Sequence, residues 1–163
     1  MLIMVSGLPG SGKSTFAAAL AAQNGCLHYN SDAMRKHMGL MGRYDLFSKL
    51  KVYQALMEQT ADALPGQSVI VDSTFFLATV RNSFYNIAFQ KNVPLHIFSI
   101  TASEEVIKER TSLKRADSEA DFAVYKKIKS EFEFITKGFL QLRSDSLDLD
   151  EMVAIANQYI KTQ

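Results

Sequence analysis

Short apolar runs alternate along the chain with longer segments in which apolar residues recur every three or four positions. Runs such as Val69-Ile70-Val71 are typical of buried strands, and the longer spacing is typical of amphipathic helices. The pattern predicts strands at Leu2–Val5, Cys26–Tyr29, Ser68–Asp72, Pro94–Ile100 and Phe139–Leu142. It predicts helices at Phe16–Ala22, Ala33–Met38, Asp45–Ala63, Leu77–Lys91, Glu104–Lys114, Ser118–Ile135 and Leu149–Ile160. Because strands alternate with helices, we expect an α/β fold of three layers, with a parallel sheet covered on both faces.

Local signals refine some of these boundaries. Asn24-Gly25 and Pro65-Gly66 are helix stops. Either Ser31 or Asp32 is expected to cap the short helix that begins at Ala33. For the helix at 45–63, the expected apolar stripe contains Leu46, Leu50, Tyr53, Met57, Thr60 and Leu64. No linker or repeat interrupts the pattern, so one domain is expected over residues 1–163, with a basic lid segment near 104–120.

A glycine-rich stretch lies between the first predicted strand and the first predicted helix. It reads Gly7-Leu8-Pro9-Gly10-Ser11-Gly12-Lys13-Ser14-Thr15 and fits G-x-x-x-x-G-K-[ST], the phosphate-binding P-loop. The backbone N–H groups of such a loop, at a helix N-terminus, bind phosphates. Lys13 is expected to reach the β- and γ-phosphates of ATP, and the Ser14 hydroxyl to bind Mg²⁺. The alternative, an ordinary glycine-rich turn before a helix, explains neither the spacing nor the Lys-Ser pair.

Composition narrows the function classes. The chain has 163 residues, 47% of them hydrophobic, and its 18 Lys and Arg against 17 Asp and Glu give a net charge of +1. Binding of extended nucleic acid normally needs a strong basic excess, so we do not expect it here, although this charge is compatible with binding a single phosphate-bearing end. One cysteine, Cys26, allows no intramolecular disulfide. The sequence has no signal peptide pattern and no apolar run of about 18 residues, so we expect a cytoplasmic protein without a membrane span.

Two aspartates follow predicted strands, at the edge of the sheet where ligands bind in parallel α/β folds. Asp72 ends the run Val69-Ile70-Val71 and is expected to hold Mg²⁺ with Ser14; the alternative is a turn or capping residue. Asp32 can accept the proton of an attacking hydroxyl, with Arg35 one helical turn away, or it can be a simple N-cap. The sequence leaves both roles of Asp32 open.

Basic residues form a second group of candidates. Arg110, Lys114 and Arg115 follow the fourth predicted strand, and a mobile basic segment there would stabilise charge on a transferring phosphoryl group. A solvated helix face is the competing interpretation of this cluster. Arg43 precedes Tyr44 in a loop flanked by glycines, which is either an exposed turn or a substrate contact.

Four features together resemble the small single-domain P-loop kinases of the polynucleotide-kinase and zeta-toxin-like group. They are the loop from Gly7 to Thr15, Ser31-Asp32-x-x-Arg35, Asp72-Ser73-Thr74 with Arg81 nine residues after the aspartate, and the arginine-rich segment ahead of Ser118-Glu119-Ala120-Asp121. The resemblance spans roughly residues 1 to 135. It implies a P-loop NTPase fold with a five-stranded parallel sheet in the adenylate-kinase-like order 2-3-1-4-5.

The resemblance also implies an activity, the transfer of the γ-phosphoryl group of ATP to a hydroxyl acceptor with Mg²⁺. By position, Lys13, Asp32, Arg110 and Arg115 are then catalytic, with Asp32 as the acceptor-activating base. Asp32, Arg35, Arg43, Thr74 and Arg81 form the substrate side. Relatives often have arginine where Lys114 stands, so Arg115 is an alternative lid residue.

Three function classes compete. A hydroxyl kinase requires all of these residues. A guanine-nucleotide switch requires Asn-Lys-x-Asp, which the sequence lacks. An ATP-binding module or ATPase that acts through a partner requires only the nucleotide site. The kinase is therefore the leading hypothesis, with the acceptor unidentified among nucleotides, small molecules and nucleic-acid 5′ ends.

Overall fold

The computed structural model describes residues 1–112 and 122–162 and contains a five-stranded parallel sheet. The strands are β1 (Leu2–Ser6), β2 (Leu27–Asn30), β3 (Val69–Ser73), β4 (Leu95–Thr101) and β5 (Leu140–Arg143). They lie in the order β2-β3-β1-β4-β5, and all four pairings are parallel. The predicted fold class and strand order are therefore confirmed.

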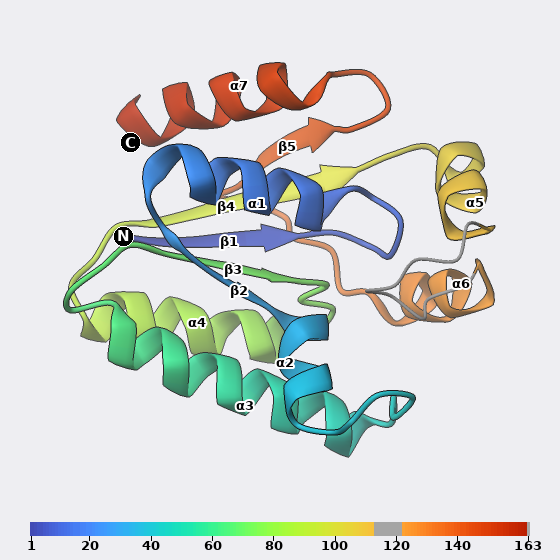
Figure 1. Cartoon of the computed structure of the whole chain (residues 1–163), viewed down its shortest axis with the longest axis horizontal. Coiled ribbons are helices and arrows are strands. Elements are labelled where there is room, and N and C mark those ends of the chain that lie inside the picture. Colours follow the sequence, from blue (N-terminus) through green and yellow to red (C-terminus); the bar gives the residue numbers. More distant parts are fainter. Residues whose placement is uncertain (113–121, 163) are drawn as a thin grey trace.

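Helices cover both faces of the sheet (Figure 1). Helices α1 (Lys13–Asn24) and α7 (Leu149–Thr162) pack on one face, and α3 (Leu46–Ala63) and α4 (Ala78–Gln90) pack on the other. Strand β1 supplies both cores, because Leu2 and Met4 belong to the α3–α4 side while Ile3 and Val5 belong to the α1–α7 side. This two-sided burial explains why the strand is a continuous apolar run.

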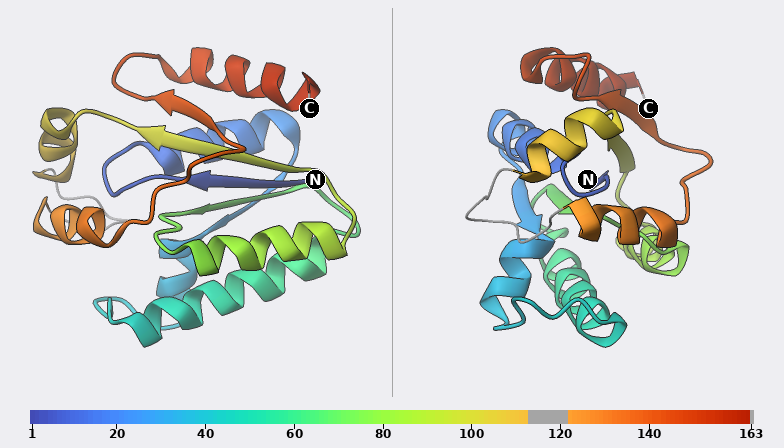
Figure 2. Two further views of the ribbon diagram at one scale, coloured as in Figure 1. Left: turned by 180° about the vertical axis from the view of Figure 1, so that it is seen from behind. Right: turned by 90° about the vertical axis from the view of Figure 1, so that its right-hand side faces the viewer.

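The remaining helices lie at the carboxyl ends of the strands (Figure 2). They are α2 (Ser31–His37), α5 (Glu104–Ser112) and α6 (Phe122–Glu131). The register pairs Ser6 with Ser73 and Asn30 with Asp72, so the segments that follow β1, β2 and β3 emerge at one edge. The fold thus brings the P-loop and both candidate aspartates to the same side of the molecule.

Three local expectations differ from the structure. Neither Ser31 nor Asp32 caps α2: the cap is Asn30, whose Oδ1 accepts hydrogen bonds from the N–H groups of Asp32 and Ala33 at 2.9 Å each. Leu46 and Leu50 are exposed, because the buried face of α3 is formed by Ser48, Val52, Tyr53, Leu56 and Thr60 and both leucines lie to one side of it. Helix α6 ends at Glu131, short of the predicted Ile135.

Part of the predicted lid lies outside the described residues. Lys114, Arg115 and the segment Ser118-Glu119-Ala120-Asp121 belong to this part, whereas Arg110 lies in α5. Among residues 1–112 and 122–162, no helix has the length and apolar character needed to cross a membrane.

Candidate functional site

A cavity of about 920 Å³ lies beside the P-loop, and residues that follow β1, β2 and β3 line it. The lining residues include Gly10, Gly12, Lys13, Ser14 and Thr15 of the P-loop segment, Asn30, Ser31, Asp32, Arg35 and Lys36 around α2, and Lys49, Tyr53, Thr74 and Phe76 across from them. The P-loop and the candidate acceptor residues therefore share one cavity. This is the arrangement that transfer between two bound molecules requires.

The P-loop backbone needs glycine at specific points. A Cβ at Gly7 would lie 2.5 Å from the carbonyl oxygen of Ile100 and from Ser11 Oγ, so no side chain fits there. Gly12 adopts φ 87°, a left-handed conformation, immediately before α1 begins at Lys13. The turn directs the free N–H groups of the first helical turn toward the cavity, where they can bind phosphate oxygens.

Asp72 is fully buried at the end of β3, close to Ser14. Asn30 Nδ2 donates to Asp72 Oδ2 at 2.5 Å and to Ser14 Oγ at 3.3 Å, and His28 Nε2 lies 3.5 Å from Asp72 Oδ2. Burial raises the pKa of the Asp72 carboxyl, but His28, the Lys13 charge, Ser14 and Asn30 outweigh burial, so the pKa lies below its ordinary value. Asp72 is therefore a carboxylate at neutral pH.

This corner of the site fits a magnesium ion. Asp72 Oδ1 is buried and has no hydrogen-bond partner, and the Ser14 hydroxyl is adjacent. An orphaned carboxylate oxygen beside a hydroxyl is a suitable donor set for Mg²⁺, which uses one or two protein oxygens together with substrate phosphates. Within the described residues, no group of three or more His, Cys, Asp and Glu side chains forms an all-protein metal site.

Asn30 is a site residue that the sequence analysis missed. Its Oδ1 caps α2, and its Nδ2 bridges Ser14 and Asp72, so one side chain joins the candidate acceptor helix to the candidate metal ligands. The available signal was its position as a polar residue between a strand and a helix, where Asn is a favoured N-cap.

The structure places Asp32 and Arg35 together on α2, where both line the cavity. Arg35 is only 6% exposed; its Nη1 donates to the Arg43 carbonyl at 2.6 Å, and its guanidinium lies 4.8 Å from the centre of the Tyr44 ring. Its Nε is buried without a hydrogen-bond partner. Arg43 itself is exposed and does not line the cavity, so only its backbone contributes here.

Thr74 lines the cavity as expected for the substrate side, whereas Arg81 does not. Arg81 is 4% exposed, and its Nη1 donates to the buried carbonyl of Phe75 at 2.7 Å. Helix α4 turns this side chain toward the protein interior, behind the loop that carries Thr74. Arg81 therefore makes a structural contact with the Phe75 carbonyl, and its expected contact with the substrate stays a prediction.

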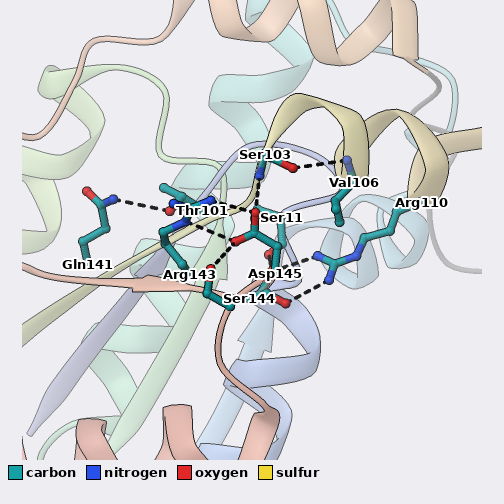
Figure 3. Close-up of polar contacts among 10 residues, drawn as sticks. Ser11, Thr101, Ser103, Val106, Arg110, Gln141, Arg143, Ser144 and Asp145 are labelled. Atoms are coloured by element: carbon teal, nitrogen blue, oxygen red, sulfur yellow. Dashed lines mark hydrogen bonds and ion pairs between the residues drawn. The ribbon is translucent and has the colours of Figure 1, made fainter.

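Arg110 lies on the other side of the P-loop from Asp32, beside a second cavity of about 210 Å³. That cavity is lined by Gly12, Thr15, Phe16, Arg110, Ser144, Leu147, Leu149 and Met152. The Arg110 guanidinium donates to Ser144 Oγ at 2.8 Å and to the Ser144 carbonyl at 3.0 Å (Figure 3). It also donates to the Gly10 carbonyl at 3.3 Å. Arg110 thus contacts the P-loop at Gly10 and lines a different cavity from the candidate acceptor residues Asp32 and Arg35.

Solved structures of several known proteins have the same architecture as this chain. The chain resembles Kti12 of Chaetomium thermophilum in complex with ADP-AlF3 (TM-score 0.78, 20% identity, 99% of this chain and 98% of that chain covered). It also resembles a gluconokinase of Sinorhizobium meliloti (TM-score 0.72, 18% identity, 99% and 97% covered). A third similar structure is the Mycobacterium tuberculosis APS kinase CysC with AMPPNP and APS (TM-score 0.74, 14% identity, 98% and 96% covered). At these identities the likeness concerns the fold.

A family model places the sequence more specifically. The model described as "AAA domain" (AAA_33) matches residues 2–135, a range that contains the P-loop, Asp32, Asp72 and Arg110. The chain therefore belongs to this AAA domain family, and its fold is that of a P-loop kinase-like domain.

Proposed function

We propose that the protein is an ATP-dependent phosphotransferase that moves the γ-phosphoryl group to a hydroxyl of an acceptor molecule. One observation carries the proposal: a single cavity of about 920 Å³ joins the P-loop to Asp32, Arg35 and Thr74 on the segments after β2 and β3. A guanine-nucleotide switch or a nucleotide-binding module needs only the part of this cavity that the P-loop lines. It does not need the charged residues Asp32 and Arg35 in the other part.

The donor is ATP in this proposal. The P-loop N–H groups and Lys13 hold the β- and γ-phosphates. The smaller cavity on the far side of the P-loop accommodates the base, between the planar guanidinium of Arg110 and the apolar side chains of Leu147, Leu149 and Met152. With the base in the smaller cavity and the phosphates on the P-loop, the γ-phosphate points toward Asp32.

Ser14 and Asp72 are the residues that would hold Mg²⁺, which would neutralise charge on the β- and γ-phosphates. Asp72 would contribute Oδ1, which has no hydrogen-bond partner among the described residues, and Ser14 its hydroxyl. Asn30 keeps these two side chains together through its Nδ2. The described residues therefore offer two oxygen ligands, a number that suits Mg²⁺ bound together with a nucleotide and water.

Asp32 serves as the base in the proposed reaction. The acceptor hydroxyl transfers its proton to the Asp32 carboxylate while its oxygen forms the new bond to the γ-phosphorus. The bond between that phosphorus and the β–γ bridging oxygen breaks, and ADP leaves with the electron pair. Arg115 lies outside the described residues, and from its place in the sequence we assign to it the stabilisation of charge on the transferring phosphoryl group.

Arg35 indicates the class of acceptor. A buried guanidinium is expensive unless it is paired, yet no carboxylate of residues 1–112 or 122–162 forms an ion pair with Arg35. Its Nε is buried without a hydrogen-bond partner among the described residues, and the Arg35 side chain lines the cavity. An acceptor that carries a phosphate or carboxylate group would provide the missing partner.

The proposal is tested by isothermal titration with Mg·ATP, followed by phosphate transfer from labelled ATP to a panel of nucleosides, sugars, 5′-hydroxyl oligonucleotides and antibiotics. We expect Lys13→Ala to abolish transfer. Asp32→Asn should retain ATP binding and lose transfer by a factor of about 10²–10⁴, the usual contribution of a general base. Asp62→Asn on the exposed side of α3 is the matched control and should behave as the wild-type protein.

Two outcomes would contradict the proposal. Near-wild-type transfer by Asp32→Asn would show that Asp32 is not the base. Tight Mg·ATP binding without transfer to any acceptor would favour an ATP-binding module or ATPase that acts through a partner.

A further inference from the structure

Ser144, the first residue after β5, makes hydrogen bonds in two directions. Its hydroxyl donates to the P-loop carbonyl of Ser11 at 2.7 Å and accepts from Arg110 Nη1 at 2.8 Å. Its own carbonyl accepts from Arg110 Nη2 at 3.0 Å (Figure 3). One small side chain therefore connects Arg110, 34 positions away in the sequence, with the P-loop carbonyl of Ser11, 133 positions away.

The place of Ser144 against the P-loop is well defined. A Cβ built on Gly12 would lie 3.2 Å from Ser144 Oγ and 3.3 Å from Ser144 Cβ, so the residue packs directly on the peptide that precedes Lys13. The Ser144 N–H donates to the Thr101 carbonyl at the end of β4 at 2.9 Å. The Ser144 backbone is thus anchored to the sheet, and its side chain is a fixed support for the loop.

Arg110 keeps its positive charge available in this arrangement. Its hydrogen bonds go to the neutral oxygens of Gly10 and Ser144, and none of the described carboxylates forms an ion pair with it. The neighbouring carboxylate of Asp145 is engaged elsewhere, by Arg143 Nη2 at 2.9 Å and by the Ser103 N–H at 2.8 Å. These two hydrogen bonds hold the pKa of Asp145 well below its usual range.

We propose that Ser144 is a positioning residue for the nucleotide, one that fixes the plane of Arg110 and the Ser11–Gly12 segment of the P-loop in a single arrangement before ATP binds. This inference rests on the proposed ATP-dependent function and adds a residue to it. The hydroxyl is both donor and acceptor, so alanine removes both connections at once. Arg110 would then lose one of its two contacts with Ser144, and the Ser11 carbonyl would lose its partner.

A double-mutant cycle on Mg·ATP affinity tests the inference. Ser144→Ala, Arg110→Met and the double variant are titrated with Mg·ATP, with Ser146→Ala as the control from the same loop. Ser146 is exposed, and its hydroxyl makes only a 3.4 Å contact with Asp145. We expect Ser144→Ala to weaken ATP binding about tenfold, the effect typical of one hydrogen bond to a charged group.

The double variant should lose less affinity than the sum of the two single losses, because part of the effect of Ser144 passes through Arg110 and the rest passes through its hydrogen bond to the Ser11 carbonyl. A merely structural role would lower the thermal midpoint and leave the affinity of the folded protein unchanged, so thermal unfolding is measured in parallel. Wild-type affinity in Ser144→Ala, or fully additive losses in the double variant, would overturn the inference. Failure of the wild-type protein to bind Mg·ATP would overturn the proposed function together with it.

Discussion

Phe75 follows the cavity residue Thr74 in a backbone conformation that residues with a side chain rarely adopt. Its φ is 53°, and its ring is fully buried at 5.2 Å from the ring of Phe84. Such a conformation costs on the order of 1–3 kcal/mol and persists only where the surroundings hold it. Tyr53 and Arg81 do so, since the Tyr53 hydroxyl accepts from the Phe75 N–H at 2.9 Å and Arg81 donates to the Phe75 carbonyl. The strained turn presents Thr74 and Phe76 to the cavity.

The variant Arg81→Ala tests whether Arg81 holds the strained backbone at Phe75. The substitution leaves the buried Phe75 carbonyl without its donor and opens space beneath the turn, so we expect the free energy of unfolding to fall by about 2–3 kcal/mol. Urea unfolding followed by circular dichroism measures the change. Asn82→Ala, on the adjacent exposed position of α4, should shift it by less than about 0.5 kcal/mol. Equal stability of the two variants would show that Arg81 does not hold the turn.

Helix α2 depends on Asn30 for both its start and its connection to the nucleotide site. The helix has seven residues, too few to be stable alone, so its N-cap is a large part of what defines it. The same side chain bridges Ser14 and Asp72. We therefore expect a substitution at this N-cap to weaken nucleotide binding. A substitution at the N-cap of another helix should not have this effect.

Asn30→Ala and Asp45→Ala compare the two caps. Asp45 caps α3 by accepting from the Ser48 N–H at 2.9 Å and from the Ser48 hydroxyl at 2.7 Å, and neither of these hydrogen bonds involves the P-loop. Each variant should lose about 1 kcal/mol of stability in urea unfolding, the usual cost of a lost N-cap. Only Asn30→Ala should also weaken Mg·ATP binding in isothermal titration. Equal ATP affinities of the two variants would contradict the bridging role of Asn30.

The elements that the sequence predicted correctly are those whose signal is local. The run Val69-Ile70-Val71 is buried on both faces of the sheet, and the P-loop residues are consecutive in the chain, so pattern alone was sufficient. The cap at Asn30 was missed because Ser31 and Asp32 are equally good capping residues in isolation. The stripe on α3 was wrong at Leu46 and Leu50 because the buried face includes the polar residue Ser48, so apolar spacing alone placed the face to one side of its true position.

At the scale of the whole molecule, the candidate site is assembled from distant parts of the chain. Ser144 contacts Ser11 across 133 positions, and Asn30 contacts Asp72 across 42. No spacing rule predicts such pairs, because they depend on the order of strands in the sheet and on the loops that follow them. The same interdependence means that a ligand in this site contacts segments from most of the fold and should stabilise the native state as a unit.

Mg·ATP should accordingly raise the thermal midpoint of the whole domain. A ligand that binds only the native state at 100 times its Kd adds about 2.7 kcal/mol. For a domain of this size that corresponds to a rise of about 5–10 °C in differential scanning calorimetry. Chelation of Mg²⁺ with EDTA should reduce the rise, since Asp72 would then face the phosphates as an uncompensated carboxylate. Lys13→Ala should lose most of it, while Lys161→Ala on the exposed end of α7 should keep it. A rise of the same size in Lys13→Ala would show that ATP stabilises the protein from somewhere other than the P-loop.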